Sequence, residues 1–132
     1  PLPDAPAISV KEKFGGSIEL SGYTLDDTKR LTLFWQTDEP LPVNYTVFVH
    51  FRNSGGVTVA QRDRQPLDGM YPTEQWQSGE TVIDPIPMPD LPDGNYTLHV
   101  GLYRLDTMER LPLSHDTSGE HAIMLGTVDY NE

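Results

Sequence analysis

Residues 91–103 read LPDGNYTLHVGLY, a turn sequence followed by a long strand. Pro92 and Gly94 are typical turn residues, and Tyr96 comes directly after the turn. From Tyr96 to Leu102 apolar or aromatic residues occupy every second position. This alternation is the pattern of a strand with one buried face. The stretch therefore predicts a tight corner that leads into a half-buried strand.

The corner resembles one found in immunoglobulin-like sandwiches. There a tyrosine near the start of a late strand hydrogen-bonds its hydroxyl back across the corner, two residues before a core position. Tyr96 is predicted to be that tyrosine, with Leu98 at the core position and Trp35 as the core tryptophan that packs against it. The alternative is an ordinary turn followed by a half-buried tyrosine.

The rest of the chain predicts further short strands. We expect strands at residues 7–14, 17–25, 30–37, 44–52, 57–62, 80–88, 91–105 and 121–130. No segment has a helical period, and short strands with frequent turns favour a sandwich or a barrel. We therefore predict an all-β, immunoglobulin-like antiparallel β-sandwich of about eight strands. It would occupy residues 7–132 as one domain, after a linker or loose N-terminal end at residues 1–6.

The composition excludes several classes of partner and site. Nine basic and twenty acidic residues give a net charge of −11, which disfavours nucleic acid and anionic membrane surfaces. No apolar run is long enough to cross a membrane as a helix. The absence of cysteine removes disulfides, zinc–thiolate sites and thiol nucleophiles. We expect an acidic domain without a metal, a cofactor, a nucleic-acid partner or a membrane-spanning segment.

The outward residues of three predicted strands form the first candidate site. We expect the strands at 30–37, 44–52 and 91–105 to lie side by side in one sheet. Their outward faces would then share an aromatic patch made of Phe34, Phe48, His50, His99 and Tyr103. Large exposed apolar patches often mark interaction sites, here for a sugar ring, a partner domain or a second copy. The alternative is that the loop at 63–79 folds over this face and makes it a second small core.

The long segment at 63–79 is the second candidate site. It has no clear period and carries Met70, Tyr71 and Trp76. Loops of this length in a domain are uncommon and often functional. Exposed aromatics beside polar groups would suit a carbohydrate-binding module.

Catalytic and metal-binding motifs are not evident. The sequence contains no Gly-x-Ser-x-Gly elbow and no His-Glu-x-x-His helix. The four histidines share no ligand spacing, and the loop carboxylates do not form a calcium-binding hand, although calcium between loops stays open. A glycoside hydrolase needs two carboxylates at a defined separation, which a sequence does not show. We therefore expect no catalytic residues and no enzyme activity.

Three segments resemble a known module. They are FGGSIELSGY at 14–23, LTLFWQ at 31–36 leading to YTVFVH at 45–50, and WQSGE at 76–80 through GLY at 101–103. The order is similar to an extracytoplasmic β-sandwich module at the C-terminal end of bacterial multi-pass membrane proteins. Many of those proteins carry a glycosyltransferase label of the dolichyl-phosphate-mannose type, and the module itself has no assigned function.

The resemblance implies an extracytoplasmic location, at the cell surface or in a periplasm-like compartment. It carries over no catalytic residue. Our leading hypothesis is a non-catalytic extracytoplasmic accessory or interaction domain, attached to a membrane protein, with a protein or glycan partner. A carbohydrate-binding module is the second hypothesis and a hydrolase the third.

Overall fold

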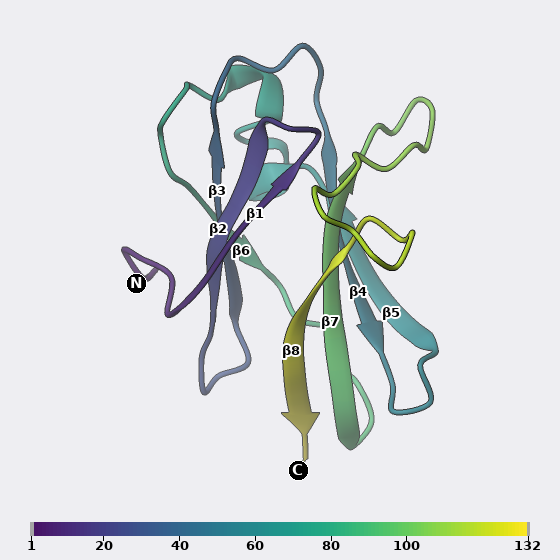
Figure 1. Ribbon diagram of the computed structural model, residues 1–132. Helices are drawn as coiled ribbons and strands as arrows, with labels where there is room; N and C mark the ends of the chain where they lie inside the picture. Colours follow the sequence, from purple (N-terminus) through teal and green to yellow (C-terminus); the bar gives the residue numbers. More distant parts are fainter. Residues whose placement is uncertain (1, 132) are drawn as a thin grey trace.

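Two antiparallel sheets of four strands pack on each other in the computed structural model, which describes residues 2–131 (Figure 1). One sheet has the strand order β1-β2-β3-β6 and the other β5-β4-β7-β8. The predicted immunoglobulin-like, all-β sandwich of eight strands is confirmed. Pro1 and Glu132 lie outside the described residues, so part of the expected linker at 1–6 does too.

The strands are short and the helical content is small. The strands are β1 (Ile8–Phe14), β2 (Ile18–Leu25), β3 (Leu31–Thr37), β4 (Thr46–Arg52), β5 (Thr58–Arg64), β6 (Val82–Ile86), β7 (Gly94–Tyr103) and β8 (Ile123–Tyr130). Two short 3₁₀ helices, η1 (Pro66–Gly69) and η2 (Thr73–Gln75), lie between β5 and β6. Within residues 2–131 no helix has the length and apolar character needed to cross a bilayer.

The strand order explains one wrong prediction. We expected the strand at 30–37 beside the strand at 44–52, but β3 lies in the other sheet, between β2 and β6. The connection between β3 and β4 contains Pro40 and Pro42, and it crosses from one sheet to the other instead of forming a hairpin. The sheet β5-β4-β7-β8 has the C′-C-F-G order of immunoglobulin-like domains, and β3 and β6 correspond to strands B and E.

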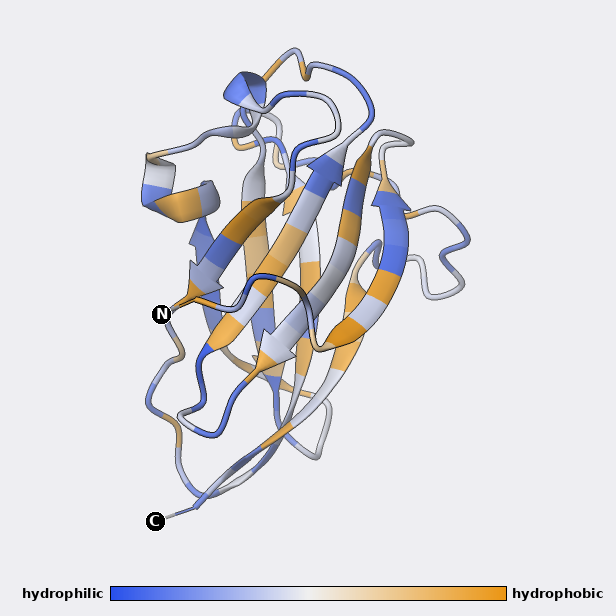
Figure 2. Cartoon of the chain, turned by 90° about the vertical axis from the view of Figure 1, so that its left-hand side faces the viewer, coloured by the Kyte–Doolittle hydropathy of each residue, from blue (hydrophilic) through white to orange (hydrophobic). Residues whose placement is uncertain are grey.

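The core lies between the inner faces of the two sheets. Alternate residues of each strand point inward, and the strands in Figure 2 accordingly show bands of alternating hydropathy. Trp35 on β3 is 0% exposed, and its ring centroid lies 6.1 Å from that of Phe14 and 6.5 Å from that of Trp76. Leu98 on β7 belongs to the same core, as predicted.

The tyrosine corner is confirmed. The Tyr96 hydroxyl donates a hydrogen bond of 2.6 Å to the carbonyl oxygen of Pro92. The Tyr96 ring meets the ring of Tyr130 edge-on at 5.5 Å, and the Tyr130 hydroxyl donates to the Pro89 carbonyl at 2.7 Å. These contacts fix the course of residues 89–93, which lead into β7.

A buried ion pair joins the two sheets where the edge strands β5 and β6 approach each other. Asp84 on β6 is 0% exposed and lies 3.0 Å from the Arg64 guanidinium on β5. The backbone N–H of Leu67 donates to the same carboxyl oxygen at 2.9 Å. Burial raises the pKa of Asp84 to about 6, and the opposing effects of Leu67 and Arg64 do not cancel the shift. Arg64 also donates to the Pro85 carbonyl, so one guanidinium holds side-chain and backbone atoms of β6.

Replacing Asp84 with Asn should change how stability depends on pH. Folding raises the pKa of Asp84 from 3.8 to about 6, so folding disfavours its ionised form. The contribution of this carboxyl group to the free energy of unfolding is therefore greatest below about pH 4. It is lost as the pH rises through about 6. We expect the free energy of unfolding of the wild type, relative to Asp84→Asn, to fall by up to about 3 kcal/mol between about pH 4 and pH 7. Urea unfolding measures this, and a difference that is constant with pH would contradict the assignment.

Replacing Tyr96 with Phe should lower the free energy of unfolding by about 1 kcal/mol, the usual net value of one hydrogen bond. The ring would keep its place against Tyr130, so the change isolates the hydroxyl contact with Pro92. Urea unfolding again provides the measurement. Equal stability of the two proteins would show that the corner hydrogen bond contributes nothing.

Candidate binding site on the outer face

A row of four residues, three of them polar, crosses the outer face of the sheet β5-β4-β7-β8. Gln61 on β5 is the register partner of His50 on β4. His50 in turn faces His99 on β7, and His99 faces Met124 on β8. Directly opposed side chains of antiparallel strands lie on the same face, about 5 Å apart at Cβ. The register therefore makes the two predicted histidines neighbours.

The next row is built around Phe48. Phe48 is the register partner of Asp63 on β5 and of Gly101 on β7. Its ring lies directly over Gly101, where an added Cβ would come within 2.4 Å of ring carbons. A glycine is therefore needed at that position. The Phe48 ring centroid lies 4.8 Å from that of His50 and 6.2 Å from that of Tyr103.

The segment that joins β7 to β8, residues 104–122, folds over this row. The Arg110 guanidinium stacks 4.2 Å from the centre of the Phe48 ring and donates to the Glu120 carbonyl at 2.7 Å. The Glu120 carboxylate forms an ion pair with Arg52 on β4. Phe48 is consequently only 1% exposed. Residues 104–122 therefore cover this face. The alternative prediction, that the loop at 63–79 would cover it, is wrong about which segment does so.

The segment between β5 and β6 folds toward the core instead. Trp76 is 2% exposed, packs against Trp35, and donates its indole N–H to the Tyr71 carbonyl at 2.9 Å. Tyr71 is half-buried, and its hydroxyl binds the Glu80 carboxylate. The two predicted aromatics of this segment, Tyr71 and Trp76, therefore lie apart from the outer face of β4 and β7.

Phe34 is also separated from the other candidates. It lies on β3, in the opposite sheet, and is fully buried. Its register partner on β2 is Gly22, where an added Cβ would meet Pro6 at 2.7 Å. The structure thus brings together four of the predicted residues, which are Phe48, His50, His99 and Tyr103, and leaves Phe34 on the other side of the molecule.

A pocket of about 270 Å³ opens in the covered face, and we call it the outer pocket. It is lined by Phe48, His50, Gln61, Asp63, Tyr103, Met108 and Arg110. Four of these residues were not singled out from the sequence. Gln61 could have been found, because it lies on the strand predicted at 57–62, whereas Asp63 was assigned to the loop at 63–79 and the structure extends β5 to Arg64. Met108 and Arg110 come from a segment without periodicity and gave no signal.

Burial shifts the pKa values of the ionisable side chains in and beside the outer pocket. The Tyr103 hydroxyl donates to Asp63 at 3.0 Å, and burial together with this carboxylate raises the pKa of Tyr103 to about 12. Burial also lowers the pKa of His50 and of His99, and the positive charge of Arg52 lowers both further. Neutral imidazoles both donate and accept hydrogen bonds. The outer pocket therefore offers an imidazole, an amide, a guanidinium and a carboxylate around an aromatic floor.

The described residues do not form a metal centre. Across residues 2–131, no group of three or more His, Cys, Asp or Glu side chains is arranged to hold a metal ion. Asp63 and Glu120 are each engaged by a neighbouring side chain, Tyr103 and Arg52 respectively. The arrangement is suited to holding a polar group by hydrogen bonds.

No protein-family model, curated protein or solved structure matches the chain. The resemblance to the extracytoplasmic module of bacterial membrane proteins therefore stays a prediction from the sequence.

The histidines provide a direct test of this geometry. Arg52→Gln removes a positive charge that lies near both rings and releases the Glu120 carboxylate, which favours the protonated imidazole. We expect the pKa of His50 and of His99 to rise in the variant, as measured by NMR titration of the ring resonances. Arg104→Gln, which removes an exposed arginine paired with Asp106, is the matched control and should leave both values unchanged. Unshifted histidines in Arg52→Gln would contradict the described contacts.

Proposed function

We propose that the chain is a non-catalytic accessory domain that acts by binding a polar partner through the outer pocket. The observation that carries this proposal is the convergence of His50, Gln61, Asp63 and Arg110 on one small cavity. Ligand sites typically combine an apolar wall with a few convergent polar groups and shifted pKa values. The extracytoplasmic location and the attachment to a membrane protein belong to the proposal and rest on the sequence resemblance.

The same pocket favours binding over catalysis. A hydrolase would need a general acid or base with a pKa suited to proton transfer and a partner across a cleft. The carboxyl group with a pKa of about 6 is Asp84, which is 0% exposed between the sheets. Glu120 lies nearer the outer pocket, but its hydrogen bond with Arg52 lowers its pKa. Neither carboxyl group is placed to serve as a catalytic acid near neutral pH.

A carbohydrate is the second, more specific candidate for the partner. Sugar hydroxyls need closely spaced donors and acceptors, which Gln61, Asp63 and Arg110 provide. Stacking on an open aromatic platform has less support, because Phe48 is covered by Arg110 and Trp76 is in the core. A sugar would therefore bind mainly through hydrogen bonds, and the volume of about 270 Å³ suits a single ring.

An NMR titration tests binding and catalysis in one sample. Backbone amide spectra of the whole chain would be recorded with a neutral disaccharide and with one that contains a uronic acid. We expect dissociation constants near the millimolar range, typical of a few hydrogen bonds and a binding free energy of about −4 kcal/mol. Shifts should concentrate on β4, β5 and β7, and the disaccharide should remain intact.

Two variants make the titration specific. Asp63→Asn and Arg110→Gln should each weaken binding at least tenfold, because each removes a charged partner worth more than about 1.4 kcal/mol. Asp27→Asn, in the exposed turn before β3, is the control and should bind like the wild type. Binding that is insensitive to both pocket variants would reject the outer pocket, and release of monosaccharide would reject the non-catalytic role.

A further inference from the structure

Residues 104–122, which we call the cover segment, are tied to both sheets by backbone hydrogen bonds. The Leu111 N–H donates to the Leu102 carbonyl on β7 at 2.8 Å. The Ser114 N–H donates to the Lys13 carbonyl on β1 at 2.9 Å. The middle of the cover segment therefore bridges the sandwich from one sheet to the other.

One backbone group in the middle of the cover segment depends on a histidine. The Leu113 N–H donates to Nδ1 of His121 at 3.1 Å. A ring nitrogen that accepts a hydrogen bond carries no proton, so this contact exists only with the neutral imidazole. The turn before His121 is folded around Asp116, whose carboxylate accepts the Gly119 N–H at 2.7 Å. The chain thus folds back on itself and holds the imidazole against Leu113.

His121 is joined to the outer pocket through its neighbour in the chain. Glu120 forms the ion pair with Arg52, and its carbonyl accepts the hydrogen bond from Arg110. Arg110 in turn lies over the ring of Phe48. A movement of His121 therefore displaces Glu120 and, with it, the guanidinium that closes the outer pocket.

A proton on Nδ1 of His121 removes the contact with Leu113. The imidazolium donates from both ring nitrogens, so Nδ1 would oppose the Leu113 N–H instead of accepting it. The Asp116 carboxylate lies 3.7 Å from Nδ1 and offers the charged ring another partner. Burial opposes ionisation of Asp116, but its hydrogen bonds lower its pKa, so it stays charged in mild acid. Since histidine ordinarily changes its charge between about pH 5 and 8, mild acid should exchange the Leu113 contact for the Asp116 contact.

Other charged and titratable side chains lie beside the cover segment. Those on β1, β4, β5 and β7 are Lys13, His50, Arg52, Asp63, His99 and Tyr103. Lys13 is paired with Asp38 at 2.6 Å, and this contact raises its pKa. Burial raises the pKa of Tyr103 to about 12. Neither Lys13 nor Tyr103 therefore changes its charge between neutral pH and mild acid.

The two histidines of the outer face act in the same direction as His121. Burial lowers the pKa of His50 and of His99 from 6.5, and the charge of Arg52 lowers both further. Nearby carboxylates, Asp63 for His50 and Glu120 for both rings, oppose this shift without cancelling it. The covered structure therefore disfavours the protonated rings, and it loses stability as the pH falls below about 6.5.

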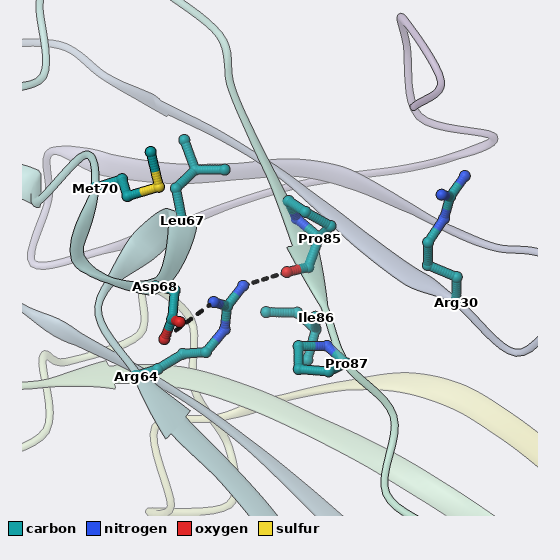
Figure 3. A pocket seen from close by; sticks show the side chains of 8 residues that line it. All are labelled: Arg30, Arg64, Leu67, Asp68, Met70, Pro85, Ile86 and Pro87. Carbon is teal, nitrogen blue, oxygen red and sulfur yellow. Dashed lines mark hydrogen bonds and ion pairs between the residues drawn. The ribbon is translucent and has the colours of Figure 1, made fainter. Parts of the chain in front are cut away.

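A further titratable contact lies at the edge strands β5 and β6 and involves no residue of the cover segment. Figure 3 shows the Arg64 guanidinium between Asp68 and the Pro85 carbonyl. Asp84 pairs with the same guanidinium and has a pKa of about 6. Acid stabilises the protein at this contact, because burial favours the uncharged carboxyl group. Its response to pH thus has the opposite sign.

We propose that His121 is a proton-sensitive switch that holds the cover segment over the outer pocket near neutral pH and releases it in mild acid. On release, Arg110 leaves the Phe48 ring together with Glu120. This movement concerns the chain alone. Its consequence for a partner rests on the function proposed for the outer pocket: a partner held by Arg110 at neutral pH would dissociate in mild acid.

Backbone ¹⁵N relaxation of the whole chain without ligand, at about pH 7.5 and about pH 5, tests the switch. We expect the heteronuclear NOE of residues 110–121 to fall at the lower pH, while that of β4 and β7 stays unchanged. The midpoint of the change at the Leu113 amide should match the midpoint of the His121 ring titration. An unchanged NOE at the lower pH, or two different midpoints, would overturn the proposal whether or not a variant folds.

His121→Asn separates the switch from a general effect of acid. Asparagine does not titrate, and its side-chain oxygen can accept the Leu113 N–H. It also tolerates the φ of 52° at this position. We expect the cover segment of this variant to stay ordered at both pH values. His115→Asn, at an exposed position of the same segment with a φ of 63°, is the matched control and should respond like the wild type.

Two further comparisons complete the test. Asp84→Asn should leave the response of the cover segment unchanged, and loss of the response in this variant or in His115→Asn would contradict the role of His121. Thermal melts verify that each variant is folded. The disaccharide titration, repeated at both pH values, should show weaker binding in acid for the wild type but not for His121→Asn. A cover segment that opens in acid in a chain that binds no sugar at either pH would support the switch and count against the proposed function.

Discussion

The burial of Trp35 between the two sheets is the contact on which the rest of the structure depends. Its ring meets Phe14 from β1 and Trp76 from the segment before β6. Because Trp76 is drawn into the core, residues 65–80 cannot cover the outer face of β4 and β7. Thr73, which is fully buried, fixes the same segment: its hydroxyl accepts from the Tyr45 N–H and donates to the Val43 carbonyl, both at 2.9 Å.

The outer pocket follows from where that segment lies. The outer face is left to residues 104–122, so Arg110 and not an aromatic ring lies over Phe48. On the other side, the segment passes through η1, where Leu67 and Asp68 have φ values of 54°. Such left-handed conformations cost non-glycine residues about 1–3 kcal/mol each. The hydrogen bond from the Leu67 N–H to the buried Asp84 carboxyl group helps to offset that cost.

The parts of the fold that depend on local pattern could be predicted from the sequence. The alternation from Tyr96 to Leu102 gave the inward and outward faces of β7, and the turn chemistry gave the corner at Pro92. The assignment of β3 to its sheet could not be predicted, since the alternation of residues 31–36 indicates the two faces of the strand but not its neighbours in a sheet. Phe34 was placed on the wrong side of the molecule for that reason. The cover of the outer face depends on the long-range contact between Arg110 and Phe48, for which residues 104–122 contain no local signal.

The central claim is that buried aromatic side chains, Trp35 and Trp76 above all, hold the two sheets of the sandwich together. Iodide quenching of tryptophan fluorescence in the folded wild-type protein tests it most directly. Both tryptophans, Trp35 and Trp76, are buried against each other in the core, so iodide should quench almost none of the emission until urea unfolds the chain. If about half of the emission were quenched in the folded protein, Trp76 would be exposed on a binding loop and the account would be contradicted.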